Sequence, residues 1–245
     1  MKALLTFHSI DDSGTVISYP TRQFARLFES LARKNIPVYS LDTLLKTDTA
    51  SGVAITFDDG MRSVYDNALP VIRDYDIPAH LFLTTKAIED QRPWPEQGPA
   101  RGFDMLDWEQ LGILQESGFS IEAHTHTHPD MRKISRQEME DECDTADRLI
   151  ADKLGKQPSY FAYPFGFHNP AARDYVREHY QGAVTVELRS LGEREDPATI
   201  PRLDMYYFQS NRSIDLIDSP LMRFFLAGRS RLRAVRGSQC DPTCS

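Results

Sequence analysis

The sequence predicts an α/β protein with a mainly parallel β-sheet, either open and doubly wound or closed into a barrel. Apolar runs typical of buried strands alternate with amphipathic helical patterns. Composition does not shift sharply before residue 205, and no internal repeat is visible. The length of 245 residues, with 40% hydrophobic and 26% charged residues, fits a soluble globular enzyme of one large or two small domains.

Seven apolar runs are predicted to be strands. They are residues 3–7, 37–40, 53–57, 79–84, 119–123, 160–163 and 183–186. Residues 201–204 are predicted to end the last strand. Helical patterns lie between most of these runs, as crossovers between parallel strands require.

Two of the predicted helices carry clear boundary signals. In residues 21–34 Thr21 is the expected N-cap, and one helical face collects Phe24, Leu27, Phe28 and Leu31. Ser135 and Glu138 form a capping box that opens a second helix, which Gly155 ends. The inner face of this second helix is predicted to be Met139, Cys143, Ala146 and Ile150. Residues 108–118 and 169–179 show the same helical period.

Charge and termini narrow the class of protein. A net charge of −8 argues against a nucleic-acid partner, because phosphate binding needs a basic surface. The sequence has no apolar run of transmembrane length and no signal-peptide pattern after Met1, so we expect a cytoplasmic protein. Three cysteines agree with a reducing compartment: Cys143 falls on a predicted helix, and Cys240 and Cys244 fall in a polar tail.

A pair of adjacent carboxylates follows the predicted strand 53–57. Asp58 and Asp59 would face opposite ways on a continuing strand, but Gly60 lets the chain turn so that both enter one pocket. Two carboxylates that close repel each other unless a cation neutralises one of them. The alternative is a helix-capping aspartate beside a solvated one.

Three histidines follow the predicted strand 119–123. On an extended strand the Cα atoms of His124 and His128 would lie roughly 13 Å apart, too far for one metal ion. On a helical turn their Cβ atoms approach to about 6 Å, so we predict that the strand curls into such a turn before Pro129. His126 would then point away and serve a supporting or structural role.

Asp59, His124 and His128 together make a set of two histidines and one carboxylate. This set suits zinc hydrolysis and also non-haem iron. Zinc lowers the pKa of bound water to about 7, and Asp58 would then be the general base that takes the proton.

A third motif comprises Tyr163, Pro164, Phe165 and Gly166, again at a predicted strand end. Two interpretations stay open for it. It is either a rigid aromatic turn or a wall of a substrate groove that offers a backbone N–H near Phe165 to an oxyanion.

These residues resemble the polysaccharide deacetylases of the NodB-homology family, carbohydrate esterase 4, over about residues 1–205. The resemblance makes Asp58 the base and Asp59, His124 and His128 the metal ligands, and it assigns Tyr163–Gly166 to the third motif with its oxyanion contact. It implies a distorted, incomplete (β/α)7 barrel, which we place in residues 1–210. The sequence pattern separately predicts a basic amphipathic helix and tail in residues 211–245. The implied metal is Zn²⁺, with Co²⁺, Ni²⁺ and Fe²⁺ as alternatives, and the implied substrate is an N-acetylated sugar or polysaccharide.

Two departures from the family pattern point to a permuted branch resembling poly-N-acetylglucosamine deacetylases. Ala162 stands where the family has an arginine that steadies the base, and the C-terminal Leu-x-His motif is missing. The resemblance therefore places the general acid at His8. We expect Arg202 to support Asp58 and Asp204 to orient His8, although these two charges could exchange roles.

Alternatives remain for the tail and for the activity. Residues 219–236 interleave five arginines with apolar residues, which indicates a helix packed on the barrel or a peripheral membrane contact suited to a lipid-linked sugar. The alternative activities are hydrolysis of another amide, as in allantoinase-like enzymes and deformylases, and a non-catalytic carbohydrate-binding barrel. Nothing in the sequence indicates the oligomeric state.

Overall fold

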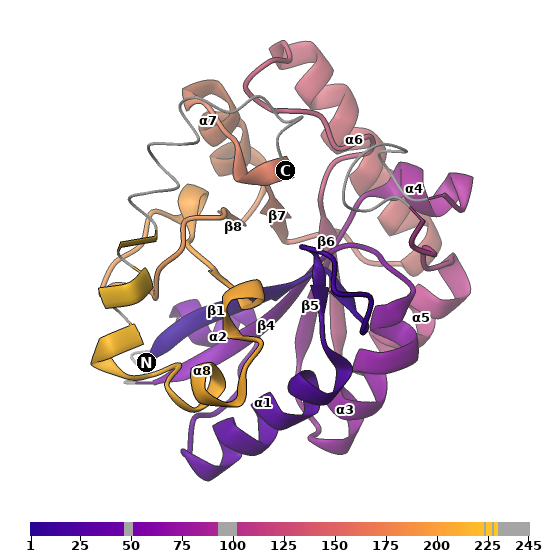
Figure 1. Ribbon diagram of the computed structural model, residues 1–245. Helices are drawn as coiled ribbons and strands as arrows, with labels where there is room; N and C mark the ends of the chain where they lie inside the picture. Colours follow the sequence, from indigo (N-terminus) through magenta and orange to yellow (C-terminus); the bar gives the residue numbers. More distant parts are fainter. Residues whose placement is uncertain (47–50, 93–101, 223, 227, 230–245) are drawn as a thin grey trace.

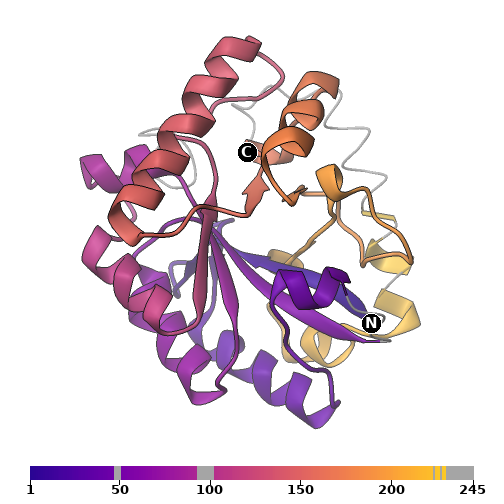
Figure 2. The same ribbon diagram turned by 180° about the vertical axis from the view of Figure 1, so that it is seen from behind.

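The computed structural model describes residues 1–46, 51–92, 102–222, 224–226 and 228–229. Within these residues seven parallel strands form one curved sheet in the order β8-β7-β6-β5-β4-β1-β9. The strands are β1 (Lys2–Phe7), β4 (Gly52–Asp59), β5 (Ala79–Leu83), β6 (Phe119–Ala123), β7 (Tyr160–Ala162), β8 (Gly182–Val184) and β9 (Leu203–Asp204). The longer helices lie around the outside of the curved sheet (Figure 1, Figure 2).

The two ends of the sheet approach each other without forming a continuous ladder. Ile200 makes an isolated parallel bridge to Val184 of β8, and Leu203 pairs with Leu5 of β1. The segment before β9 therefore spans the gap between the edge strands. The prediction of a distorted, incomplete (β/α) barrel is confirmed.

Six of the seven predicted strands are confirmed, and the run at residues 37–40 is wrong. That run contributes a single bridge, from Val38 to Val53, because α2 (Leu41–Lys46) begins directly afterwards. The seventh strand of the sheet is β9, which lies within residues 201–204, where the last strand was predicted to end. A short parallel pair, β2 (Ser9–Ile10) with β3 (Ser18–Tyr19), was not predicted.

The helices agree with the sequence pattern except at one cap. In α1 (Thr21–Arg33) the N-cap is Pro20, so the prediction of Thr21 as N-cap is wrong: Thr21 is already helical. In α6 (Arg136–Leu154) the Ser135–Glu138 capping box and the left-handed Gly155 are both present. The predicted inner faces of α1 and α6 are buried. The other helices are α3 (Leu69–Asp74), α4 (Thr85–Asp90), α5 (Trp108–Glu116), α7 (Pro170–His179) and α8 (Asn211–Asp215).

The strands bury different side chains on their two faces. Alternate residues of β1, among them Leu5 and Phe7, pack against the surrounding helices, whereas Leu4 belongs to a separate inner cluster with Ala54 and Phe82. Residues of α2 complete this inner cluster. The inner face of the sheet is apolar around this cluster. Its polar side chains lie toward the carboxyl ends of β4 and β6.

A buried polar pair ties α2 to the sheet. His80 Nε2 accepts the backbone N–H of Leu41 at 3.0 Å, and Nδ1 contacts Glu122 Oε1 at 3.2 Å. The other carboxylate oxygen of Glu122 accepts the N–H groups of Ser159 and Tyr160. This arrangement satisfies the buried carboxylate and joins α2, β5, β6 and β7.

The start of the predicted C-terminal region packs on α1. Asp215 pairs with Arg26 and Arg33, and Asp218 pairs with Lys34. Residues 223, 227 and 230–236 of the predicted basic segment lie outside the described residues, as do Cys240 and Cys244. Among the residues described, no helix is long and apolar enough to cross a membrane.

Candidate active site

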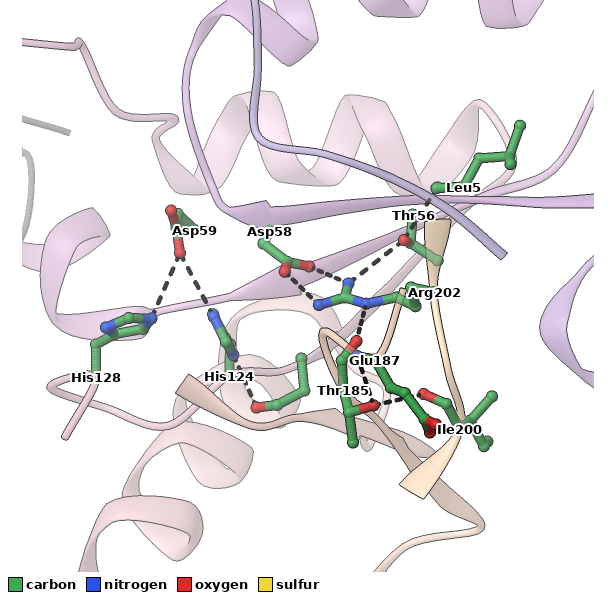
Figure 3. Close-up of polar contacts among 11 residues, drawn as sticks. Leu5, Thr56, Asp58, Asp59, His124, His128, Thr185, Glu187, Ile200 and Arg202 are labelled. Atoms are coloured by element: carbon green, nitrogen blue, oxygen red, sulfur yellow. Dashed lines mark hydrogen bonds and ion pairs between the residues drawn. The ribbon is translucent and has the colours of Figure 1, made fainter. Parts of the chain in front are cut away.

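Asp58 and Asp59 point in different directions although they are adjacent at the end of β4. The strand continues through Asp59, which has a left-handed φ of +73°, and Gly60 follows at +93°. The predicted change of direction therefore starts one residue earlier than expected. Asp58 turns toward Arg202, and Asp59 turns toward the two histidines (Figure 3).

Asp58 forms a bidentate ion pair with Arg202. The Nη1–Oδ1 and Nη2–Oδ2 distances are 2.7 and 2.6 Å, and both side chains are almost fully buried. The guanidinium also donates from Nε to the carbonyl of Thr185. Burial raises the pKa of Asp58, but the charge and hydrogen bonds of Arg202, together with the charges of His124 and His8, outweigh burial and hold that pKa below its usual value of 3.8. Arg202 thus contacts Asp58 as predicted, and Asp58 is ionised at neutral pH.

The two histidines converge without the predicted helical turn. The segment after β6 is an irregular loop in which Thr125 and His128 have φ of +65° and +58°, so that prediction is wrong. His128 N donates to Thr125 Oγ1, which closes the loop on itself. The rings of His124 and His128 lie 4.8 Å apart between centroids, so the loop still brings the imidazoles together.

Asp59, His124 and His128 suit a divalent metal ion. Their ligand atoms lie within 4.8 Å of one another, and Asp59 Oδ1 is 3.4 Å from His124 Nε2 and 3.8 Å from His128 Nε2. Bonds of about 2.0–2.2 Å to a tetrahedral zinc ion place neighbouring ligand atoms about 3.3–3.6 Å apart. The two distances from Asp59 to the histidines are close to this spacing, so the residues fit such an ion. His124 Nδ1 donates to the carbonyl of Ala162 at 2.8 Å, which leaves the Nε2 lone pair for the metal. Burial lowers the pKa of His128 to about 3, so its imidazole is neutral as a ligand must be.

His8 lies near this site, and Asp204 lies near His8. His8 follows β1, and its charge is close enough to lower the pKa values of both Asp58 and Asp59. His8 and Asp204 line one small hollow, whose wall also includes Val16 and Tyr206. Asp204 Oδ1 accepts the N–H of Tyr206. The structure therefore places His8 near the two aspartates and Asp204 on the same hollow as His8, and the roles of both residues stay predictions.

The third motif forms a wall next to His128. Phe165 has φ of +58°, its ring lies edge-on to His128 at 4.5 Å, and it is 36% exposed. Tyr163 and Pro164 are buried instead, and the Tyr163 hydroxyl donates to the carbonyl of Ala198. Of the predicted substrate-contacting residues, the side chain of Phe165 is thus the one that reaches the surface beside the histidines.

Sequence reasoning missed the residues that hold the histidine loop. His126 Nδ1 contacts Thr85 Oγ1 at 2.9 Å, in line with the predicted supporting role of His126. The Glu142 carboxylate accepts the N–H groups of His126 and Thr127. Glu142 is one of several acids on a helix that is polar outside, so no local pattern distinguishes it.

The chain belongs to the polysaccharide deacetylase family, whose family model matches residues 46–183. It is 27% identical over 193 residues to the protein YxkH of Bacillus subtilis (strain 168), covering 75% of this chain and 64% of that protein. It is 26% identical over 161 residues to the poly-beta-1,6-N-acetyl-D-glucosamine N-deacetylase of Staphylococcus epidermidis, covering 62% of this chain. The match spans only 53% of that relative's length.

Solved structures share the fold at lower sequence identity. A Streptococcus pyogenes deacetylase, PplD, in complex with acetate has a TM-score of 0.75 at 19% identity, covering 89% of this chain and 96% of the other. IcaB from Ammonifex degensii has a TM-score of 0.69 at 21% identity, covering 88% and 98%. The likeness therefore extends over nearly the whole barrel.

Proposed function

We propose that this protein is a metal-dependent hydrolase that removes N-acetyl groups from an N-acetylated sugar or polysaccharide. The observation that carries the proposal is the placement of the Asp58–Arg202 ion pair beside the Asp59, His124 and His128 group, close enough for the Asp58 charge to raise the pKa of His124 (Figure 3). An ionised carboxylate next to a suitable metal-ligand set is the arrangement that metal-assisted amide hydrolysis requires.

A divalent ion held by Asp59, His124 and His128 would supply an acidified water and polarise the acetamide carbonyl. Asp58 accepts a proton from that water, and Arg202 keeps Asp58 ionised and fixed in orientation. Oxygen adds to the carbonyl carbon, the C–N bond breaks, and acetate and a sugar amine are released. His8 delivers the proton to the leaving nitrogen, and Asp204 orients His8. A backbone N–H near Phe165 stabilises the oxyanion.

The class of substrate is proposed from the relatives. One relative is named for N-deacetylation of poly-beta-1,6-N-acetyl-D-glucosamine, although the match spans 53% of its length. The exposed side chain of Phe165 lies beside His128, and the exposed Val186 lies next to Gly166; both would contact the apolar face of a sugar ring. A lipid-linked N-acetylated sugar is a further substrate of the same chemical class.

A substrate panel with the metal-loaded protein tests this proposal. We expect acetate release from N-acetylglucosamine oligomers, loss of release after chelation, and recovery when Zn²⁺ or Co²⁺ is restored. Hydrolysis of allantoin or of formylated amines, without acetate release from N-acetylated sugars, would show that the enzyme acts on another class of amide. Oligomer binding without turnover of any amide would favour a carbohydrate-binding barrel.

A further inference from the structure

The loop between His124 and His128 has a conformation that its own sequence does not favour. Thr125 and His128 have left-handed φ values, which residues with a side chain rarely adopt. Such a conformation persists when surrounding contacts hold it in place. Because the loop carries two of the proposed metal ligands, whatever holds it also sets the distance between their imidazoles.

One side of the loop is held from α6. Glu142 Oε2 accepts the backbone N–H of His126 at 3.0 Å and that of Thr127 at 2.7 Å. Glu142 Oε1 accepts the Thr127 hydroxyl at 2.5 Å. A single carboxylate therefore binds two successive N–H groups and the side-chain hydroxyl of the second residue. These are the N–H groups at the middle of the segment that joins the two ligands.

The other side of the loop is held from α4. The N–H groups of Thr85 and Lys86 donate to the carbonyls of Thr125 and His126, at 3.4 and 2.9 Å. The Thr85 hydroxyl contacts His126 Nδ1. The first residues of α4 thus bind the carbonyls and the ring of the loop, while Glu142 binds its N–H groups.

We propose that Glu142 is a positioning residue that holds residues 126–127 so that His124 and His128 can bind one metal ion. Without its carboxylate, the two N–H groups turn to water and the loop samples conformations in which the imidazoles lie further apart. A metal must then reorder the loop as it binds, which weakens its affinity. The inference rests on the proposed metal site, but it is independent of the substrate.

Zinc titration of the metal-free protein against a competing chelator tests the role of Glu142. Glu142→Ala removes the acceptors, and we expect zinc affinity to fall about 10-fold, the lower end of the range for supporting residues around metal ligands. Glu142→Gln should bind zinc nearly as well as the wild type. Its amide oxygen can accept both N–H groups, and its NH₂ can donate to the Thr127 hydroxyl. Glu140→Ala is the matched control, since Glu140 is an exposed acid on the same helix paired with Arg136.

Two further measurements separate positioning from other effects. Thermal unfolding of each metal-free variant reports loss of fold, and the Co²⁺ absorption spectrum reports the geometry of the ligands. Unchanged affinity in a folded Glu142→Ala would overturn the inference. An equal loss of zinc affinity in Glu142→Gln and Glu142→Ala would also overturn it. In that case the negative charge of Glu142, and not its hydrogen bonds, would support zinc binding.

If Glu142→Ala does not fold, Thr127→Val provides the second test. It removes the hydroxyl that Glu142 binds and leaves the carboxylate in place. We expect a several-fold loss of zinc affinity at unchanged stability, and an unchanged affinity would contradict the inference.

Discussion

Arg202 and Asp58 form a buried bidentate ion pair although they are 144 positions apart in the chain. Each side chain alone would be a charge buried without a partner, which is costly. Together they fix the orientation of the proposed base at the carboxyl end of β4. The pair joins β4 to the segment before β9, which spans the gap in the barrel.

Breaking this pair should reduce stability more than replacing both of its members. We expect Arg202→Met and Asp58→Asn each to lower the free energy of unfolding by about 3–5 kcal/mol, because each leaves one buried polar partner uncompensated. The double variant should be more stable than the sum of the single losses predicts. Urea unfolding of the four proteins gives the coupling energy, and strictly additive losses would contradict the interpretation.

His124→Ala should lose zinc binding, whereas Asp58→Asn should lose turnover and keep zinc binding. His124→Ala removes a proposed ligand and should lose the stabilisation by zinc, which is about 2.7 kcal/mol when zinc is at 100 times its Kd. Asp58→Asn should keep that stabilisation and lose acetate release. Calorimetric unfolding with and without zinc checks the first result, and an acetate assay checks the second. Normal turnover by Asp58→Asn would rule out its role as base.

His8→Ala tests the proposed general acid. We expect kcat to fall about 10²–10⁴-fold while zinc affinity stays at the wild-type value, because His8 is outside the ligand set. His179→Ala is a suitable control, as His179 lies at the end of α7 and stacks on Tyr175. Full activity in His8→Ala would remove this residue from the mechanism.

Gly166 should tolerate a methyl group less well than Gly155, although both have φ near +70°. A Cβ on Gly155 would meet nothing within 4 Å, so Gly155→Ala should cost only the left-handed strain of about 1–2 kcal/mol. A Cβ on Gly166 would lie 2.4 Å from Val186 Cγ2 and 2.8 Å from its backbone nitrogen. Gly166→Ala should therefore cost more in urea unfolding and displace Phe165. Equal losses in the two variants would contradict this steric explanation.

Asp147 should make stability depend on pH. Burial raises its pKa to about 7, and the negative charges of Asp144 and Glu122 add to this, while the Tyr180 hydrogen bond and His179 lower it. Between about pH 4 and pH 7 the folded state then holds a proton that the unfolded state has released. Stability should accordingly fall as pH rises through this window.

Asp147→Asn removes the titrating carboxyl group. The free energy of unfolding should then fall less between about pH 4 and pH 7. Chemical unfolding at several pH values measures the slope, with Asp152→Asn as a control at an exposed position on the same helix. The same slope in the wild type and in Asp147→Asn would show that another group is responsible.

Elements with a clear local pattern could be predicted from the sequence. Strands such as β1, β4 and β6 bury nearly every residue and read as continuous apolar runs, and the capping box of α6 has a signature within four residues. The prediction of a strand at residues 37–40 was wrong because a helix begins immediately after this apolar run. The prediction of Thr21 as N-cap was wrong because Pro20 takes that position.

The sequence by itself determined the order of the elements and the position of the motifs at strand ends, because periodicity and spacing are local properties. From these it was possible to name Asp58, Asp59, His124 and His128, and the resemblance added His8 and Arg202. The tertiary structure alone decided how they meet. The left-handed turns at Asp59 and Thr125 and the hold of Glu142 on the histidine loop depend on contacts between segments distant in the chain, which leave no periodic signal in the sequence.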